Sequence, residues 1–379
     1  MTPLDSAPAK RLSHLTHSPI DCHFNASPRD FVVREIPLYE PSGSGEHIFA
    51  CVRKRGLSTF ELISTLASAL SCKARDIGYA GLKDKAATTY QFLSFHRSLE
   101  ANLTRALPFL ESKQIKILSL TPHHNKLKIG HLRANAFFMR LKKVSPSAAS
   151  KLHAIVQILE KSGFANYFGN QRFGKEGDNF LQGANLAHTQ KKRKSKLDNF
   201  LISSYQSHLF NRWLNARIEL ARILRGFTSA EVLHALSALP SLSPLRAHLT
   251  KHTIQALQAQ GGAFPLLPGD VMCHYPHGKM YLCEDIEAES KRFIAREVAP
   301  MGALCGSKLF GAQGVAHALE EGFLDSALYA IGSRRYAWVW ASEISARYIE
   351  QKAHYELSFT LPKGSYATIF LENLLNIQS

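Results

Sequence analysis

The sequence contains few cysteines and no paired cysteine motif. Six cysteines occur in 379 residues, and none of them forms a C-x-x-C pair. A disulfide framework needs closely placed cysteines in an oxidising compartment, so this spacing favours a reduced, cytoplasmic protein. The sequence also lacks an apolar run near the roughly 20 residues that span a bilayer, and its first residues lack the apolar centre of a signal peptide. We therefore expect no association with a membrane.

Several common catalytic motifs are absent as well. The chain has no G-x-x-x-x-G-K-[ST] loop, no H-E-x-x-H helix and no recognisable Ser/His/Asp set, and Asp84 has no partner carboxylate nearby of the kind that glycosidases use. These absences disfavour P-loop, zincin, serine-hydrolase and glycosidase chemistry. Cys273, His274, His277 and Cys283 lie close together in the sequence, but their spacing is not a standard zinc spacing. The segment is typical of a β-hairpin, so we expect neither a metal nor another cofactor.

Acidic residues are scarce. The chain has 46 Lys and Arg against 30 Asp and Glu, a formal charge of +16. Such an excess predicts a polyanionic partner, and nucleic acid fits better than a membrane surface. The densest basic run holds Lys191, Lys192, Arg193 and Lys194. This run is either a solvated arm or a contact to a phosphate backbone, and its charge alone does not separate the two.

The first part of the chain alternates strand and helix patterns. Residues 31–36 and 45–56 are typical of strands, and Ser58 with Glu61 forms the capping box of a helix that ends before Asp76. Two extended segments follow, and a short polar break that contains Asp84 separates them.

The later segments predict a second strand-and-helix region and a different middle. Phe137, Met139 and Leu141 alternate on one strand face, and Ser145 and Gly163 bracket a helix. Residues 166–183 show no strand or helix period, so we expect a structured loop, and a long helix follows. The last residues again predict a strand, a turn and a closing helix. Similar flanks around a different middle suggest one domain inserted into another.

Asp84 lies between Lys83 and Lys85, and the residues alone leave its role open. It could be a turn residue that hydrogen-bonds its own backbone. It could also be a nucleophile whose pKa the adjacent cations lower.

Six segments in order resemble the TruD family of pseudouridine synthases, whose bacterial members modify uridine 13 of transfer RNA. The resemblance runs from about residue 28 to about residue 375 and is weaker beyond about residue 215. The segments that carry it are FVVREI, GEHIFACVRKRGLST, GYAGLKDKAATTYQ, GHLRANAF, NYFGNQRFG with GDNFLQGA, and LPKGSYAT.

The resemblance implies an α+β fold in which a pseudouridine synthase catalytic domain has a largely antiparallel sheet. Residues 1–165 and 316–379 would form this domain, and residues 166–315 an inserted TRUD-type α/β domain. It also implies an isomerase that converts uridine to pseudouridine in tRNA, without a cofactor and without an obligate protein partner.

The same resemblance assigns the site residues. Asp84 matches the nucleophilic aspartate of the family. Some members have a lysine where this chain has Asn25, so no cation is assigned to that position. The residues that match the uridine pocket are Phe31, Lys83, Asn135, Phe137 and Tyr366.

Two other classes of function share part of this pattern. A non-catalytic RNA-binding or RNA-folding protein would share the charge and the aromatic residues but would give Asp84 no role. A metal-dependent RNA hydrolase is disfavoured because the sequence shows no clustered carboxylates.

Overall fold

The computed structural model describes residues 10–189 and 195–377, and the chain divides into two compact units. We call Ile20–Ile155 with Ala341–Gly364 the sheet unit. Met1–Pro19, Val156–Trp340 and Ser365–Ser379 form the helix unit. The inserted domain expected at residues 166–315 falls within the helix unit, and its assignment as a separate domain stays a prediction.

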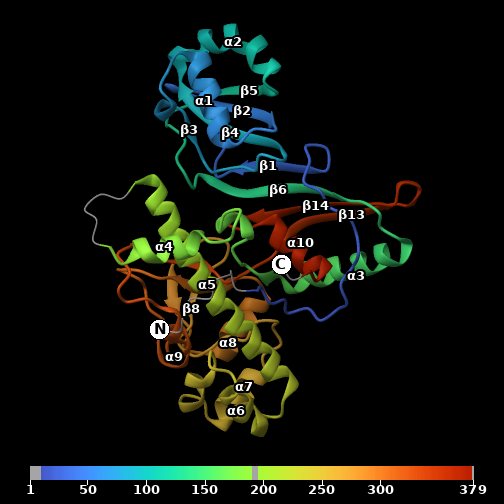
Figure 1. Ribbon diagram of the computed structural model, residues 1–379, viewed down its shortest axis with the longest axis vertical. Helices are drawn as coiled ribbons and strands as arrows, with labels where there is room; N and C mark the ends of the chain where they lie inside the picture. The colour runs from blue at the N-terminus through green and yellow to red at the C-terminus, as the bar shows by residue number, and fades with distance from the viewer. Residues whose placement is uncertain (1–9, 190–194, 378–379) are drawn as a thin grey trace. The chain divides into compact units, whose positions relative to one another are not determined.

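The sheet unit is built on one mixed sheet with the strand order β13-β14-β6-β1-β4-β2-β5, to which β3 adds by pairing with β4 (Figure 1). Among the described strands of this sheet, only β1 and β4 pair in parallel. The expected α+β class with a largely antiparallel sheet is confirmed. The elements are β1 (Phe31–Pro37), β2 (His47–Arg55), α1 (Thr59–Leu70), β3 (Gly78–Tyr79), β4 (Thr88–His96), α2 (Glu100–Ser112), β5 (Ile115–His123), β6 (Leu132–Leu141), α3 (Pro146–Ser162), β13 (Ser342–Ile349) and β14 (His354–Pro362). Helix α3 continues into the helix unit.

Local sequence signals explain where these helices begin and end. The capping box of α1 forms as expected, because Ser58 accepts from the amide of Glu61 and the Glu61 side chain accepts from the amide of Ser58. The Ser145 hydroxyl caps α3 by accepting from Ala148, and Gly163 ends that helix with a φ of +72°. Helix α2 and strand β5 also form, although the sequence analysis identified neither.

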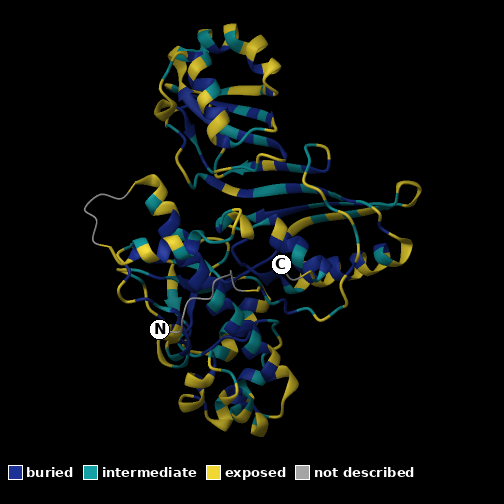
Figure 2. Cartoon of the chain, in the orientation of Figure 1, coloured by how far each residue is buried: buried dark blue, intermediate teal, exposed yellow. Residues whose placement is uncertain are grey.

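Helices α1 and α2 cover one face of the sheet. Alternate β2 residues Ile48, Ala50 and Val52 are buried against them, together with Leu93 and Phe95 of β4. Figure 2 shows both helices buried on the sheet side and exposed on the outer side. Burial of this apolar face drives the packing. We call it the helix face, and the other side of the sheet the open face.

The helix unit contains the long helix α5 and a smaller sheet with the order β11-β10-β8-β9. Residues expected to form only a loop also contain helix α4, so that expectation was partly wrong. The elements of the helix unit are β7 (Phe164–Ala165), α4 (Asn179–Ala187), α5 (Lys196–Gly226), α6 (Ser229–Ser237), α7 (Lys251–Gln258), β8 (Val271–His274), β9 (Met280–Leu282), α8 (Ile286–Ile294), β10 (Val298–Leu304), α9 (Gly314–Glu320), β11 (Ser333–Tyr336), β12 (Trp338–Val339) and α10 (Ala367–Leu375).

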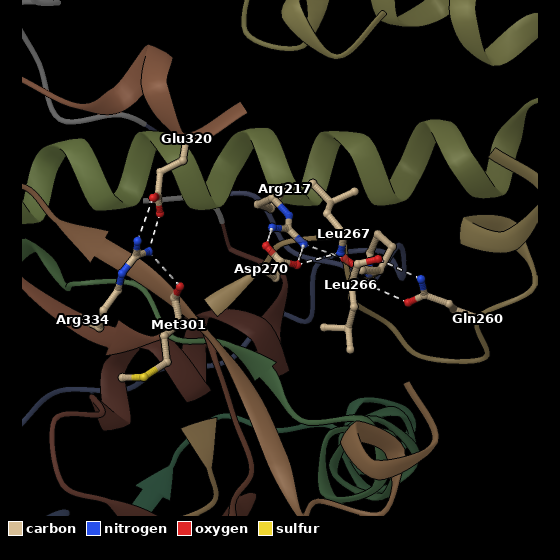
Figure 3. Close-up of polar contacts among 9 residues, drawn as sticks. Arg217, Gln260, Leu266, Leu267, Asp270, Met301, Glu320 and Arg334 are labelled. Atoms are coloured by element: carbon tan, nitrogen blue, oxygen red, sulfur yellow. Dashed lines mark hydrogen bonds and ion pairs between the residues drawn. The ribbon is translucent and has the colours of Figure 1, made fainter. Parts of the chain in front are cut away.

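Two buried ion pairs stabilise the helix unit (Figure 3). Arg217 of α5 donates to both carboxylate oxygens of Asp270 at 2.6 and 2.8 Å. Arg334 of β11 contacts both oxygens of Glu320 at the end of α9. All four side chains are at most 6% exposed, so each charge depends on its partner. Because each of these charges is neutralised by its partner, we assign the two ion pairs a structural role.

Candidate active site

The connection that carries Asp84 is attached to buried groups at several points. Its Gly81 carbonyl accepts from the Gln91 side chain of β4 at 2.8 Å. The amide of Lys83 donates to the Thr59 hydroxyl at the start of α1 at 2.9 Å. Gln91 and Thr59 are themselves buried and hydrogen-bonded to each other. The helix face therefore holds this loop in one conformation.

A buried lysine completes the attachment. Lys54, near the end of β2, is 0% exposed, and its ammonium donates to the carbonyls of Leu57 at 2.6 Å and Asp84 at 2.9 Å. A longer bond of 3.5 Å reaches the carbonyl of Lys83. Burial lowers the pKa of Lys54 to about 8, and the nearby charge of Asp84 opposes this shift. The ammonium thus binds the main chain of the loop directly at Asp84.

The two lysines beside Asp84 each have an acidic partner of their own. The Lys83 ammonium lies 2.7 Å from the Glu35 carboxylate of β1, and both side chains are buried. Lys85 pairs at 2.6 Å with Glu61 on the surface, where both side chains are more than 40% exposed. Within the described residues, the Asp84 carboxylate itself makes no hydrogen bond. It therefore remains available to a substrate.

Burial raises the pKa of Asp84, and the charges of Lys54 and Lys83 oppose that rise without cancelling it. The expectation that adjacent cations lower this pKa was wrong in its direction. Desolvation of the carboxylate outweighs the attraction of both lysines, and Lys83 is in addition paired with Glu35. Lys85 is likewise occupied by Glu61.

Three aromatic rings stack on the helix face beside this loop. The ring centres of Phe31 and Phe137 lie 6.2 Å apart, with an angle of 8° between the ring planes. The ring centres of Phe137 and Phe359 lie 5.4 Å apart, with an interplanar angle of 26°. Strand register places Phe137 opposite Val33, and Asn135 opposite Glu35. The Asn135 side-chain oxygen is buried and has no hydrogen-bond partner among the described residues. An unpaired buried acceptor is costly, so a ligand that donates to it would be favoured.

The whole chain matches known proteins. The family model "tRNA pseudouridine synthase D (TruD)" matches residues 11–193 and 182–374. A tRNA pseudouridine synthase D from Helicobacter hepaticus is 60% identical over 369 residues, covering 97% of this chain and 96% of the relative. One from Wolinella succinogenes is 46% identical, with coverages of 96% and 98%. This chain belongs to the TruD family.

A crystal structure supports the fold of this TruD family member. The chain matches a protein from Methanosarcina mazei assigned as tRNA pseudouridine synthase D (TruD), with a TM-score of 0.61 and 20% identity. The match covers 97% of this chain and 96% of that one. At this identity the similarity shows the fold alone.

The sheet unit contains five of the six predicted catalytic and pocket residues of this TruD family member. Phe31, Asn135 and Phe137 share the helix face, and Lys83 joins them through its ion pair with Glu35. Tyr366 belongs to the helix unit, where its ring lies 6.2 Å from that of Phe168. The four basic residues Lys191, Lys192, Arg193 and Lys194 lie outside the described residues. The roles of all these residues stay predictions.

Lys54 is the residue that the sequence analysis missed. A signal was available, because Lys54 continues the alternation of Ile48, Ala50 and Val52, which places it on the buried helix face. A lysine is rarely fully buried without a specific partner. Its position in this pattern could therefore have indicated a buried polar contact near the end of β2.

The segment considered for a metal forms a hairpin instead. Strands β8 and β9 pair antiparallel, with Cys273 opposite Met280. The two cysteines of the segment, Cys273 and Cys283, are consequently not cross-strand partners. Among the described residues, no group of three or more His, Cys, Asp or Glu side chains is placed to hold a metal ion. No described helix is long and apolar enough to cross a membrane.

Proposed function

We propose that this protein is a tRNA pseudouridine synthase that isomerises uridine to pseudouridine, with Asp84 as its nucleophile and uridine 13 as its target. The observation that carries the proposal is the Asp84 loop, whose main chain is held by buried Lys54 and whose carboxylate is unpaired among the described residues. Membership of the TruD family supports both the reaction and tRNA as the substrate.

The reaction needs one reactive carboxylate and no change of oxidation state. The N1–C1′ bond of uridine breaks, the base rotates, and a C5–C1′ bond forms. The proton on C5 is lost, and N1 is protonated, so atoms balance within the nucleotide. Asp84 could attack C6 of the base or C1′ of the ribose, or assist loss of the C2′ proton to give a glycal. All three routes use an ionised Asp84.

The surroundings of Asp84 suit a base that is turned out of an RNA helix. A flipped base needs an apolar face to lie against and polar groups that read its edge. Phe31 and Phe137 would supply the apolar face, and the unpaired oxygen of Asn135 could accept from an N–H group of the base. The family resemblance also implies a role for Tyr366 in binding uridine. The basic residues Lys191, Lys192, Arg193 and Lys194 are proposed to contact the RNA backbone.

The activity test is direct. Unmodified tRNA transcript is incubated with the protein, and pseudouridine is then located by carbodiimide treatment and primer extension. We expect one strong stop at uridine 13. A transcript without a stop at any position would contradict the proposed function, and a stop elsewhere would contradict only the proposed target.

We expect full activity after exhaustive chelation with EDTA. The isomerisation needs no Lewis acid, and the carboxylate supplies the nucleophile. The initial rate of pseudouridine formation is compared for protein dialysed with and without EDTA, and the metal content of both samples is measured. A loss of rate restored by zinc would contradict this expectation and would redirect attention to Cys273, His274, His277 and Cys283.

We expect the acid limb of the single-turnover rate to lie above the ordinary carboxyl pKa of 3.8. Burial raises the pKa of Asp84, so its carboxylate becomes protonated at a higher pH than an exposed aspartate, and the rate falls there. The measurement is the rate between pH 4 and pH 8 at saturating tRNA, with circular dichroism confirming that the protein stays folded. A rate independent of pH down to the ordinary carboxyl range would contradict this prediction.

A further inference from the structure

The open face of the sheet carries a basic groove. A groove of about 720 Å³ is lined by residues of β1, β2, β4 and β6 and of the segment before β1, and four of its nine lining residues are arginines. Its lining includes Arg29, Arg34, Arg55, Thr88, Tyr90 and Arg140. All of them belong to the sheet unit.

Strand register shows that this groove lies on the side of the sheet away from Asp84. Arg34 of β1 is level with Tyr90 of β4, which is in turn opposite Arg53 of β2. The next residues along these strands, Glu35 and Gln91, point to the helix face, where they contact Lys83 and Gly81 of the Asp84 loop. Successive side chains of a strand alternate between faces, so the two sites are separated by the thickness of the sheet.

The charge of the groove is largely uncompensated. The groove residues Arg29, Arg34 and Arg55 form no ion pair with a carboxylate among the described residues, and neither does Arg53, which lies outside the lining. The buried Nε of Arg53 also has no hydrogen-bond partner there. Arg140 differs, because Asp30 and Glu356 neutralise it at 3.2 and 2.9 Å. Guanidinium groups that lack an acidic partner are suited to bind an anionic ligand.

An aromatic ring orders one of these arginines. The guanidinium carbon of Arg34 lies 3.7 Å from the centre of the Tyr90 ring. This stacking occupies the face of the guanidinium but leaves its N–H edge free to bind phosphate oxygens. Arginines stacked on aromatic residues of an open sheet are well suited to RNA, which offers both phosphates and planar bases. An acidic protein segment would use the charge but not this aromatic surface.

We propose that the open-face groove around Arg34 and Arg55 binds the phosphodiester backbone of RNA, at a place separate from the Asp84 site. The RNA partner is identified as tRNA by the proposed function, on which this part of the inference rests. A second contact behind the sheet would let the protein bind parts of the tRNA that are distant from the modified nucleotide. The total charge of +16 supports such an extended contact.

The test compares two double variants with equal loss of charge. Arg34→Ala/Arg55→Ala removes two groove cations, and Arg105→Ala/Lys113→Ala removes two exposed cations on and just after α2, which covers the helix face. Dissociation constants for tRNA are measured by fluorescence anisotropy at several KCl concentrations. We expect the groove variant to bind roughly tenfold more weakly, with a log–log salt slope that is smaller by about 1.5. The control variant should retain the wild-type slope.

A crosslinking experiment places the RNA without relying on affinity. Arg34→Cys and Arg105→Cys, each in a protein whose native cysteines are replaced by serine or alanine, are labelled with azidophenacyl bromide. We expect tRNA to crosslink from position 34 and not from position 105, and excess polyglutamate not to prevent it.

The possible outcomes are distinct. An unchanged salt slope in the groove variant, or a crosslink that polyglutamate abolishes, would overturn the inference in favour of no RNA site or an acidic protein ligand. The inference would also be overturned if the Arg34→Ala/Arg55→Ala protein bound tRNA with the wild-type dissociation constant and lost only rate at saturating tRNA. If wild-type protein formed no pseudouridine but still crosslinked to tRNA, the proposed function would fail while the groove would stand.

Discussion

We expect the Asp84→Asn protein to bind tRNA and to form almost no pseudouridine. Asparagine preserves the shape of the side chain and is well tolerated in turns, but it cannot act as the nucleophile. The single-turnover rate should therefore fall by several orders of magnitude, because the carboxylates of Glu35 and Glu61 near this loop are paired with Lys83 and Lys85. If Asp84 only shaped its turn, the variant would isomerise uridine at nearly the wild-type rate.

Binding and stability separate chemistry from structural damage in this variant. Removal of a negative charge should leave tRNA affinity unchanged or slightly higher. Because burial raises the pKa of Asp84, the native state binds its proton more tightly than the unfolded state does. Stability from this group thus decreases as the pH rises through its titration, and at pH 7 the neutral amide avoids that loss. The Tm should be equal to or above that of the wild type.

A matched control uses a carboxylate elsewhere in the same unit. Asp21 is exposed, and Asp21→Asn makes the same chemical change away from the loop. We expect wild-type single-turnover rates from this control on the same tRNA preparation. An Asp84→Asn protein that retained nearly full activity would exclude Asp84 as the nucleophile, whatever the behaviour of the control.

The second large effect is expected for Lys54→Met. Methionine fills much of the same volume but removes the ammonium donor of the Leu57 carbonyl, and it leaves the Asp84 carbonyl only the 3.5 Å contact from the Thr89 hydroxyl. Each unsatisfied buried group costs about 1–3 kcal/mol, so the Tm should fall. The Asp84 carboxylate would also lose its position, and small misplacements of a reacting group cost about a hundredfold in rate. We expect a decrease in the single-turnover rate of that order.

The pH profile distinguishes positioning of Asp84 from a purely structural effect. The charge of Lys54 opposes the rise in the pKa of Asp84, so its removal should move the acid limb of the rate to a higher pH. Since the pKa of Lys54 is about 8, the wild-type rate should decline above that pH as the ammonium is lost, and Lys54→Met should lack this alkaline limb. Lys73→Met, a change at an exposed lysine, is the control. An acid limb at the wild-type position in Lys54→Met would contradict this role.

Asp84 and Lys54 have different roles in the proposed site. Asp84 would supply the reactive group. Some family members have a lysine where this chain has Asn25, and Lys54 would supply the cation that this position lacks. Lys54 binds mainly the main chain of the loop, whereas Lys83 is committed to Glu35. The cation that orders the reactive loop thus comes from a strand that precedes it by 30 residues.

Much of the local structure was readable from the sequence. The strands near Phe31 and Phe137 alternate with period two, and the helices after Ser58 and Ser145 carry their own capping residues. The residue pattern also predicted that Asp84 lies in a connection between two extended segments. All these signals arise between residues that are close in the chain, where side-chain periodicity and capping act directly.

By itself, the sequence determined several strands and helices of the sheet unit but not α2 or β5, together with the family resemblance and the basic charge that predicts an RNA partner. Only the tertiary structure decided which groups meet: Lys54 with the Asp84 carbonyl, Lys83 with Glu35, and Asn135 opposite Glu35. It also decided that burial outweighs the flanking cations and raises the pKa of Asp84. The physical reason is that strand register joins residues 30 to 100 positions apart, and the energy of a charge depends on the desolvation that this packing produces.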